Sequence, residues 1–382
     1  MTKLEKMIEE LCPNGVKYVQ ISKCVEKVSK INWTLETDNF EYIDLTSVNR
    51  YTHLIEETIT INSDNAPSRA QQIIREDDIL FGATRPMLKR YCVIPEKYDN
   101  QICSTGFCVL RARKDIILTR WLYHNISSTE FFAHVEKYQK GASYPAITEK
   151  EVKSFKIPLP PIEVQREIVR ILDNFTELSA ELSAELSARK KQYDYYRDEL
   201  LTFKDDGVEY RPLSDKALFK FCYGKGNKIP ADTGGIYDVY GANGVVSHID
   251  DYNCEDVTII GHIGAVGLVN RCKGKCFVTY NGTIANVVDK SMINTQYFYY
   301  VLTTLNLPSY KKGSQPFLSV SDFESIEIPV PPLPVQEHIV KILDRFDKLC
   351  NDITEGLPAE IEARQKQYEY YRDKLLAFKM KE

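Results

Sequence analysis

The chain contains one long segment twice. The first copy starts at Pro158 with PLPPIEVQREIVRILDNF and finishes at Phe203 with ARKKQYDYYRDELLTF. The second starts at Pro329 with PVPPLPVQEHIVKILDRF and finishes at Phe378 with ARQKQYEYYRDKLLAF. A repeat this long indicates a duplicated supersecondary unit, which constrains the fold more than any local propensity does. We call the two copies the arms. The segments before them do not visibly repeat, so two constant arms alternate with two variable modules.

Each arm has the apolar spacing of an amphipathic helix. In the first arm, apolar residues recur three and four positions apart from Ile162 onward. The tetrad Glu-Leu-Ser-Ala then occurs three times, at 177–180, 181–184 and 185–188. We expect one helix of about 40 residues, roughly 60 Å long at about 1.5 Å per residue. A helix this long needs a partner helix along its stripe, and the second arm supplies one. The stripe positions are Gln165, Ile168, Leu172, Phe175, Leu178, Leu182, Leu186 and Tyr196 in the first arm, and Gln336, Ile339, Leu343, Phe346 and Tyr371 in the second.

The second arm differs from the first in two ways. It contains Gly356-Leu357-Pro358, which should break or kink the helix, with Pro358 opening the next segment. It is also four residues longer between the matching glutamine and tyrosine, Gln336 to Tyr368 against Gln165 to Tyr193.

The start of the chain resembles the exit from an arm. Gly15-Val16-Lys17-Tyr18 follows a short helical stretch at 3–11, as Gly207-Val208-Glu209-Tyr210 follows the first arm. We therefore expect a pseudo-twofold, circular arrangement that is cut near residue 1. The predicted parts are an N-terminal helix at 1–14 that closes the ring, a module at 15–158, a helical spacer at 159–206, a module at 207–329 and a helical region at 330–382.

The modules are predicted to be mostly β with short helices, so the fold class is α+β. The first should have strands at 40–45, 72–81 with a turn at 76–78, 91–94 and 106–111, and one helix at 118–138. The second should have strands at 257–261, 264–270, 276–280 and 285–288, and a helix at 295–305.

Composition excludes several classes of protein. The chain has 382 residues, 43% hydrophobic and 27% charged, which is typical of globular proteins rather than disordered ones. No run approaches the roughly 18 apolar residues of a membrane span, and MTKLEKMIEELCPNG lacks a signal-peptide core. We expect a cytoplasmic protein that makes no membrane contact. The net charge of −5 argues neither for nor against nucleic-acid binding, because the local electrostatic field at a surface matters more than the total charge.

No catalytic or metal motif is visible. The ten cysteines include no C-x-x-C pair, so free thiols are favoured over zinc. The chain lacks a Gly-x4-Gly-Lys-Ser/Thr phosphate loop and the Asn/Asp-Pro-Pro-aromatic tetrapeptide of amino-methyltransferases. No histidine has the spacing of a nucleophile pair or a metal site. We therefore expect no catalytic residues and no metal in this chain.

Nucleic-acid binding is the functional class with candidate residues. Basic and amide side chains cluster at turns between the predicted strands, where arginine and lysine suit phosphates or guanine and asparagine suits adenine. A second element, basic residue–glycine–serine, precedes each arm and suits a phosphate clamp. Solvated loop charge and simple turns are the alternative. The candidates are Arg69, Arg75, Arg85, Lys89, Arg90, Lys140 and Ser143 in the first module, and Lys225, Asn227, Lys228, Asn243, Lys273, Lys275, Asn281, Lys311, Lys312 and Ser314 in the second.

The arms carry a family resemblance. The pattern Ile-Pro-x-Pro-Pro-x-x-x-Gln-x-x-Ile-Val-x-Ile-Leu-Asp at 157–173 and 328–344 resembles the conserved regions of type I restriction–modification specificity subunits. The alternation of helices with dissimilar modules and the tetrads are also similar to that family, over essentially the whole chain. The resemblance implies two target recognition domains, separated by two long antiparallel helices, that each bind half of a bipartite site in double-stranded DNA. It also implies partners: two modification subunits that use S-adenosylmethionine, and two restriction subunits that use ATP and Mg. No cofactor is expected in this chain.

The resemblance gives the helix stripes and tetrads a role. The helices would set the spacer between half-sites and dock the modification subunits, so that each tetrad lengthens a ruler. The alternative is that the repeat only lengthens a coiled coil that tolerates insertions, with no effect on the spacing. The rival function is a helical scaffold whose two β modules bind protein partners, which steep salt dependence of DNA binding would argue against.

Overall fold

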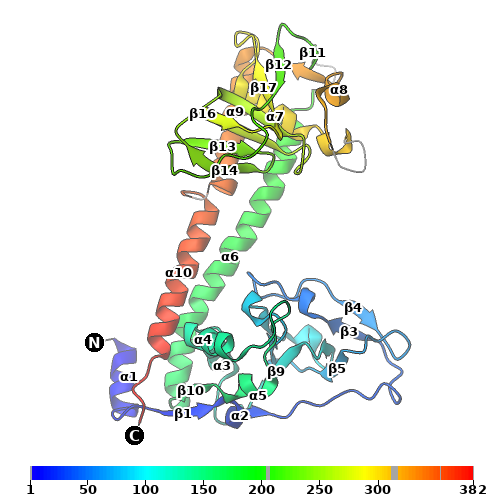
Figure 1. Ribbon diagram of the computed structural model, residues 1–382. Coiled ribbons are helices and arrows are strands. Elements are labelled where there is room, and N and C mark those ends of the chain that lie inside the picture. Colours follow the sequence, from blue (N-terminus) through cyan, green and yellow to red (C-terminus); the bar gives the residue numbers. More distant parts are fainter. Residues whose placement is uncertain (1, 204–206, 311–316, 353, 382) are drawn as a thin grey trace. The chain divides into compact units, whose positions relative to one another are not determined.

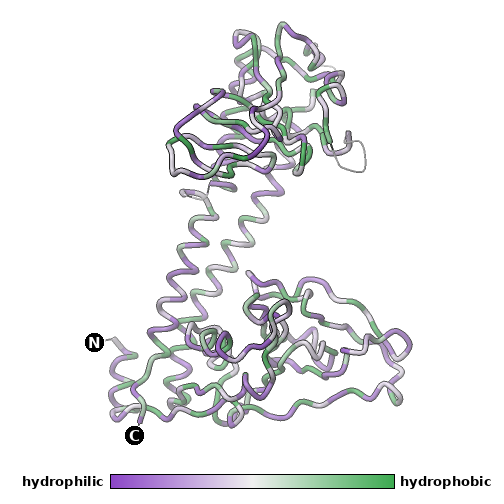
Figure 2. Tube along the Cα trace, in the orientation of Figure 1, coloured by the Kyte–Doolittle hydropathy of each residue, from purple (hydrophilic) through white to green (hydrophobic). Residues whose placement is uncertain are grey.

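The computed structural model describes residues 2–203, 207–310, 317–352 and 354–381. It divides into two compact units, each of which is described by itself (Figure 1). Unit 1 comprises residues 1–183 and 360–382, and unit 2 comprises residues 184–359. Both mix β-sheets with helices, which confirms the α+β class. In Figure 2, hydrophobic residues gather in the strands, while hydrophilic residues predominate along α10 (Leu357–Leu376).

Unit 1 contains two four-stranded sheets and one two-stranded ribbon. The sheets have the orders β2-β9-β6-β7 and β4-β3-β8-β5, and β1 pairs with β10. The strands are β1 (Lys17–Gln20), β2 (Val25–Glu26), β3 (Phe40–Ile43), β4 (Ile59–Ile61), β5 (Ala70–Ile73), β6 (Ile79–Gly82), β7 (Tyr91–Val93), β8 (Ile102–Ser104), β9 (Phe107–Ala112) and β10 (Lys156–Leu159). The helices are α1 (Lys3–Leu11), α2 (Ile21–Cys24), α3 (Thr119–Ile126), α4 (Thr129–Tyr138), α5 (Glu149–Ser154), and the short 3-10 helices η1 (Leu45–Ser47), η2 (Pro86–Leu88) and η3 (Glu96–Tyr98).

Unit 2 is built on one six-stranded sheet with the order β12-β17-β15-β16-β13-β14, and β11 pairs with β18. Its strands are β11 (Glu209–Pro212), β12 (Phe219–Tyr223), β13 (Tyr237–Gly241), β14 (Gly244–Ile249), β15 (Cys254–Gly261), β16 (Val269–Val278), β17 (Gly282–Val287) and β18 (Glu327–Val330). Its helices are α7 (Thr295–Thr304), η4 (Leu307–Tyr310), α8 (Val320–Phe323) and α9 (Leu333–Asn351).

The first arm forms one helix, α6 (Ile162–Leu200), as its spacing predicted. The second arm forms two helices, α9 and α10, and the predicted interruption is confirmed. Gly356 lies against the last turn of α9, where a Cβ would come within 2.6 Å of the carbonyl oxygens of Lys348 and Asp352. The Asp352 side chain accepts a hydrogen bond from the backbone N–H of Thr354. This local turn ends α9, and Pro358 lies in the first turn of α10.

Each unit attaches its module to the helix of the following arm in the same way. In unit 1 the buried Gln165 amide accepts from Leu118 N–H and donates to the carbonyls of Ile116 and Pro160. In unit 2 the buried Gln336 amide accepts from Asn294 N–H and donates to the carbonyls of Met292 and Pro331. The same three bonds recur because the duplicated sequence places each glutamine one turn into its helix. The duplication is therefore visible in the side-chain contacts as well as in the amino-acid sequence.

The N-terminal segment joins the end of the second arm within unit 1, and Figure 1 shows both termini close together there. Val16 forms a parallel bridge with Met380, and the Tyr18 hydroxyl donates to the carbonyl of Phe378 at 2.9 Å. In unit 2 the Tyr210 hydroxyl donates to the carbonyl of Phe203 at 3.0 Å. These matching bonds are the contacts expected if the chain start completes the second arm.

Three predicted elements are wrong. The helix predicted at 118–138 is split into α3 and α4, because the Ser128 hydroxyl accepts from Phe131 N–H and caps a new helix. The strands predicted at 264–270 and 276–280 are replaced by a loop and the single strand β16. The glycines at 264 and 267 have positive φ, so this segment turns where the sequence pattern suggested extension.

Candidate nucleic-acid interface

Strand β6 separates two ends of the first module that differ in charge. Its carboxyl end leads into the loop at 83–90, and neither this loop nor the segment 138–146 contains an aspartate or glutamate. Its amino end follows a turn with Glu76, Asp77 and Asp78, and Glu76 N–H bonds to the Asp99 carboxylate. A polyanion is expected to approach the first of these ends and to avoid the second. We call them the acid-free end and the acidic end of the module.

At the acid-free end, the structure brings together two candidate sets that are far apart in sequence. Arg85 N–H donates to the carbonyl of Pro145 at 2.7 Å, and Thr84 forms a bridge with Ala146. The Arg85 guanidinium lies over the Tyr144 ring, 4.1 Å from its centroid. The loop that holds Arg85 and Lys89 therefore lies beside the loop that holds Lys140 and Ser143. Lys140 is exposed, with its ammonium 3.8 Å from the Glu151 carboxylate.

Sequence reasoning missed Tyr144, which is 69% exposed and stacks with Arg85. It also missed the neighbouring loop with Arg50 and Tyr51, which are in contact with each other. This loop reaches the same end because the His53 ring stacks on Tyr91, at 3.9 Å between centroids. An aromatic residue beside an arginine in a turn was the available signal.

The remaining candidates of the first module differ in placement. Arg69 belongs to the acid-free end, since its carbonyl accepts from Thr105 N–H beside the start of β9. Arg90 turns inward, and its guanidinium donates to the carbonyls of Leu45 and Val48. Arg75 lies on the acidic turn, where its N–H bonds to the Asp78 carboxylate at 2.8 Å. The structure therefore does not bring the Arg75 and Arg90 side chains together with the other basic candidates.

The second module also has an acid-free end, at the carboxyl end of β15. The segments 223–228, 241–246, 262–268, 279–283 and 317–318 contain no aspartate or glutamate. Lys225 forms a bridge with Thr279, and His262 N–H donates to the carbonyl of Asn281. Gly261 packs so closely on Ala242 that a Cβ would lie 2.7 Å from the Ala242 carbonyl oxygen. The loops with Lys225, Asn243 and Asn281 thus meet at one end of the sheet.

Two lysines of the second module do not join this set. Lys275 is opposite Glu255 at the other end of β15, with its ammonium 4.4 Å from the centroid of the Tyr252 ring. Lys273 lies 3.8 Å from the Asp344 carboxylate. Asn227 and Lys228 are exposed on the loop after Lys225. Lys311, Lys312 and Ser314 lie outside the described residues.

The stripe residues of the arms fall into two classes. Six are buried inside their own unit: Gln165, Ile168, Leu172, Gln336, Ile339 and Leu343. The others are half-buried or exposed along the helices: Phe175, Leu178, Leu182, Leu186, Tyr196, Phe346 and Tyr371.

Exposed tyrosine pairs recur at equivalent positions of the arms. Tyr195 and Tyr196 lie edge to face with ring centroids 5.4 Å apart, and Tyr370 and Tyr371 do so at 5.3 Å. Tyr195 is 63% exposed and Tyr370 is 62% exposed. Aromatic residues that remain exposed on a helix are frequent in protein interfaces.

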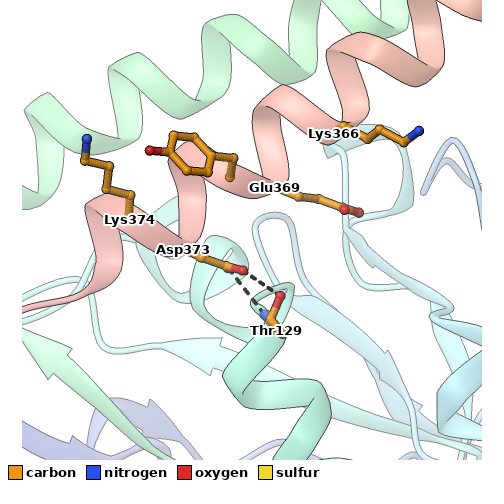
Figure 3. A pocket seen from close by; sticks show the side chains of 6 residues that line it. Thr129, Lys366, Glu369, Asp373 and Lys374 are labelled. Carbon is orange, nitrogen blue, oxygen red and sulfur yellow. Dashed lines mark hydrogen bonds between the residues drawn. The ribbon is translucent and has the colours of Figure 1, made fainter.

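Tyr370 also lines an open groove of about 670 Å³ in unit 1. Figure 3 shows Lys366, Glu369, Asp373 and Lys374 along α10, with the Asp373 side chain pointing to Thr129 at the start of α4. The Asp373 carboxylate accepts from Thr129 N–H and from the Thr129 hydroxyl. The groove is lined by side chains of both charges, which suits contact with a polar protein surface more than a small apolar ligand.

The described residues offer no group of histidine, cysteine and carboxylate side chains that could hold a metal ion. All ten cysteines are free. Burial raises the pKa of the Cys92 and Cys108 thiols to about 12, so these thiols are protonated and unreactive. Burial, with the Lys89 ammonium nearby, lowers the pKa of His53 to about 4. Within the same described ranges, no helix has the length and apolar character of a membrane span.

Comparison with known proteins agrees with these features. A family model described as the type I restriction modification DNA specificity domain matches residues 8–189 and 212–363. The chain belongs to this family. Specificity subunits recognise DNA sequence for type I restriction–modification systems, and DNA recognition is therefore the role of this chain.

Individual relatives are similar over most of the chain. The EcoR124I/EcoR124II specificity subunit of Escherichia coli is 37% identical over 304 residues, covering 68% of this chain and 71% of that protein. A putative specificity subunit of Haemophilus influenzae is 31% identical over 288 residues, covering 69% and 74%. An S subunit structure from M. genitalium has a TM-score of 0.62 at 17% identity, covering 95% and 96%. A structure from work on assembly of the type I R-M system also reaches 0.62, at 23% identity, covering 95% and 98%. These two structures share the fold.

Proposed function

We propose that this specificity subunit binds a bipartite site in double-stranded DNA, one half-site at the acid-free end of each module. The observation that carries the proposal is the pair of acid-free ends, one in each module. The same glutamine attaches each module to its duplicated helix. Glu76 and Asp99 in the first module and Glu255 in the second lie at the opposite end of the central strand. Phosphates dominate the affinity of a protein for DNA, so an end without carboxylates is the one that duplex DNA can approach.

The first module is suited to hydrogen-bonded recognition. Arg85 is held by its stacking on Tyr144, which limits the freedom of a side chain that reads guanine in a bidentate manner. Lys89 and Lys140 are exposed and suit phosphate contacts. The chain contributes binding and positioning and carries out no covalent step.

The modification subunits would dock on the arms. Two copies of one partner need two copies of one surface, and the tyrosine pairs Tyr195–Tyr196 and Tyr370–Tyr371 supply such a repeat. Two restriction subunits would complete the assembly. S-adenosylmethionine, ATP and Mg would then be held by these partners.

The helical arms would act as the spacer between half-sites. Deletion of Glu181–Ala184 removes one tetrad from α6, which shortens the helix by about 6 Å and rotates the following residues by about 40° beyond a full turn. B-DNA rises about 3.4 Å per base pair. We expect the methylated site to lose one or two base pairs of spacer and to keep both half-site sequences.

The experiment is methylation mapping of a host genome that expresses the full complex with either the wild-type chain or the tetrad deletion. Substitution of the same tetrad by four alanines is the matched control, because it keeps the length of the helix and should keep the spacing. An altered half-site with the original spacing would contradict the spacer role. Methylation at one continuous site would contradict the bipartite assignment.

A further inference from the structure

The loops that follow the central strands of the two modules have the same backbone arrangement. Gly82 N–H donates to the carbonyl of Arg90, and Gly261 N–H donates to that of Leu268, both at 2.8 Å. One residue later, Ala83 N–H and His262 N–H donate to the carbonyls of Gly106 and Asn281. The next residues, Thr84 and Ile263, form bridges with Ala146 and Phe317. The Ile147 and Leu318 N–H groups donate back to the carbonyls of Ala83 and His262. These four matches place loop 83–90 and loop 262–268 at equivalent positions.

The two equivalent loops have different chemistry. The first reads ATRPMLKR and carries three cationic side chains. The second reads HIGAVGL, and its one polar side chain, His262, is buried with its Nδ1 atom 3.0 Å from the Thr283 hydroxyl. Since burial lowers the pKa of His262, the ring is neutral at physiological pH. The exposed side chains of the second loop therefore have no hydrogen-bonding group.

Apolar side chains form a connected surface around this second loop. The His262 ring lies between Tyr223 and Phe317, with ring centroids at 4.8 and 5.4 Å. Phe317 bridges to Ile263 through the backbone. Tyr223, Ile263 and Phe317 are 49%, 42% and 38% exposed. Exposure at this level in three neighbouring apolar residues is a feature of binding surfaces.

Charge indicates what this surface binds. Lys225 follows Tyr223 by two residues, Lys228 lies on the same loop, and none of the contributing segments contains a carboxylate. A cationic rim without acidic residues fits a polyanion. Apolar groups within such a rim can recognise the C5-methyl group of thymine, which projects into the major groove and is the base feature that apolar side chains read.

We propose that the second module recognises a thymine in its half-site through its C5-methyl group, contacted by Ile263 and Phe317. This inference rests on the proposed function, because it assigns a ligand group to the acid-free end of the second module. Under this proposal the two modules recognise DNA by different chemical groups. The first module reads through the charged Arg85 loop, and the second reads an apolar edge through the equivalent loop.

The test uses the complex of the full chain with its modification subunits and a duplex that contains its mapped methylation site. Each thymine is replaced in turn by deoxyuridine, which removes only the methyl group, and binding is measured by fluorescence anisotropy. We expect one thymine of one half-site to lose about fourfold in affinity, the value of one buried methyl-sized group. Ile263→Ala should weaken binding to the thymine duplex and abolish the difference between thymine and deoxyuridine at that position.

Val288→Ala is the matched control. Val288 is 52% exposed, follows the other end of β17, and should leave the deoxyuridine effect unchanged. Affinity that is indifferent to every deoxyuridine substitution, or a full deoxyuridine effect in Ile263→Ala, would overturn the methyl contact while specific binding persists. Equal affinity for the mapped site and a scrambled duplex would instead contradict the proposed function itself. Failure of one proposal is thus distinguishable from failure of the other.

Discussion

The buried glutamine that begins each arm gives the sharpest prediction about stability. We consider Gln165→Leu, which keeps the volume of the side chain and removes its amide. Gln165 is fully buried and forms bonds of 3.0, 3.2 and 2.9 Å with Leu118 N–H and the carbonyls of Ile116 and Pro160. Each buried backbone group that loses its partner costs about 1–3 kcal/mol. Three such groups predict a loss of about 3–9 kcal/mol, which is a large fraction of the stability of a typical domain.

Urea unfolding of the full chain, followed by circular dichroism, measures this loss. Hydrogen exchange with mass spectrometry locates it, and exchange should rise first in segments 116–120 and 160–168. Gln336→Leu should give a loss of similar size, located instead in segments 292–297 and 331–340, because Gln336 forms the same three bonds in unit 2.

Gln365→Leu is the matched control, since Gln365 is exposed on α10 and its amide donates to the Glu369 carboxylate. It should change the free energy of unfolding by less than about 0.5 kcal/mol. If Gln165→Leu were as stable as this control, the glutamine would not be what attaches the first module to its arm. The hydrogen bonds shared by Gln165 and Gln336 would then reflect the duplication without contributing to stability.

Three further outcomes are expected. Burial lowers the pKa of His124 to about 4 against about 6.5 in an unfolded chain, so stability is complete above pH 6.5 and falls between pH 6.5 and 4. This pH-dependent loss of stability amounts to about 3 kcal/mol. It should be absent in His124→Gln, as measured by urea unfolding at a series of pH values. Gly356→Ala should destabilise the chain by about 1–3 kcal/mol, since its Cβ would lie 2.6 Å from two carbonyl oxygens, and thermal unfolding would detect this. Arg85→Ala should weaken DNA binding by the assembled complex about tenfold or more, whereas Arg75→Ala at the acidic end should not; equal effects in a salt titration would refute the division into two ends.

The pseudo-symmetric framework could be predicted because the amino-acid sequence of the arm is repeated. The helix of the first arm, its interruption at Gly356 in the second, and the helix at 3–11 all follow from spacing, proline and glycine. These are local rules, and local rules operate on neighbouring residues. The split between α3 and α4 shows their limit, since the apolar spacing runs through Ser127 and Ser128 and only the capping bond of Ser128 ends the pattern.

The types of residue in the candidate site could be predicted from the sequence, but which individual residues lie together could not. Sequence alone selected basic turn residues, and it treated Arg75 like Arg85 because both are arginines near a predicted strand end. Which turns and loops share each end of β6 is not decided until its pairing with β9 fixes the register. The same argument separates Lys225 from Lys275 across β15.

The sequence by itself determined that the chain is a duplicated frame with two dissimilar modules, and that its arms are helical. Those properties depend on periodicity, which each segment carries alone. Only the tertiary structure decided which loops share an end, that Gln165 and Gln336 face inward, and that Ile263 takes the place that Thr84 holds in the first module. Such facts depend on strand order and register, and these are set by contacts between residues far apart in the chain.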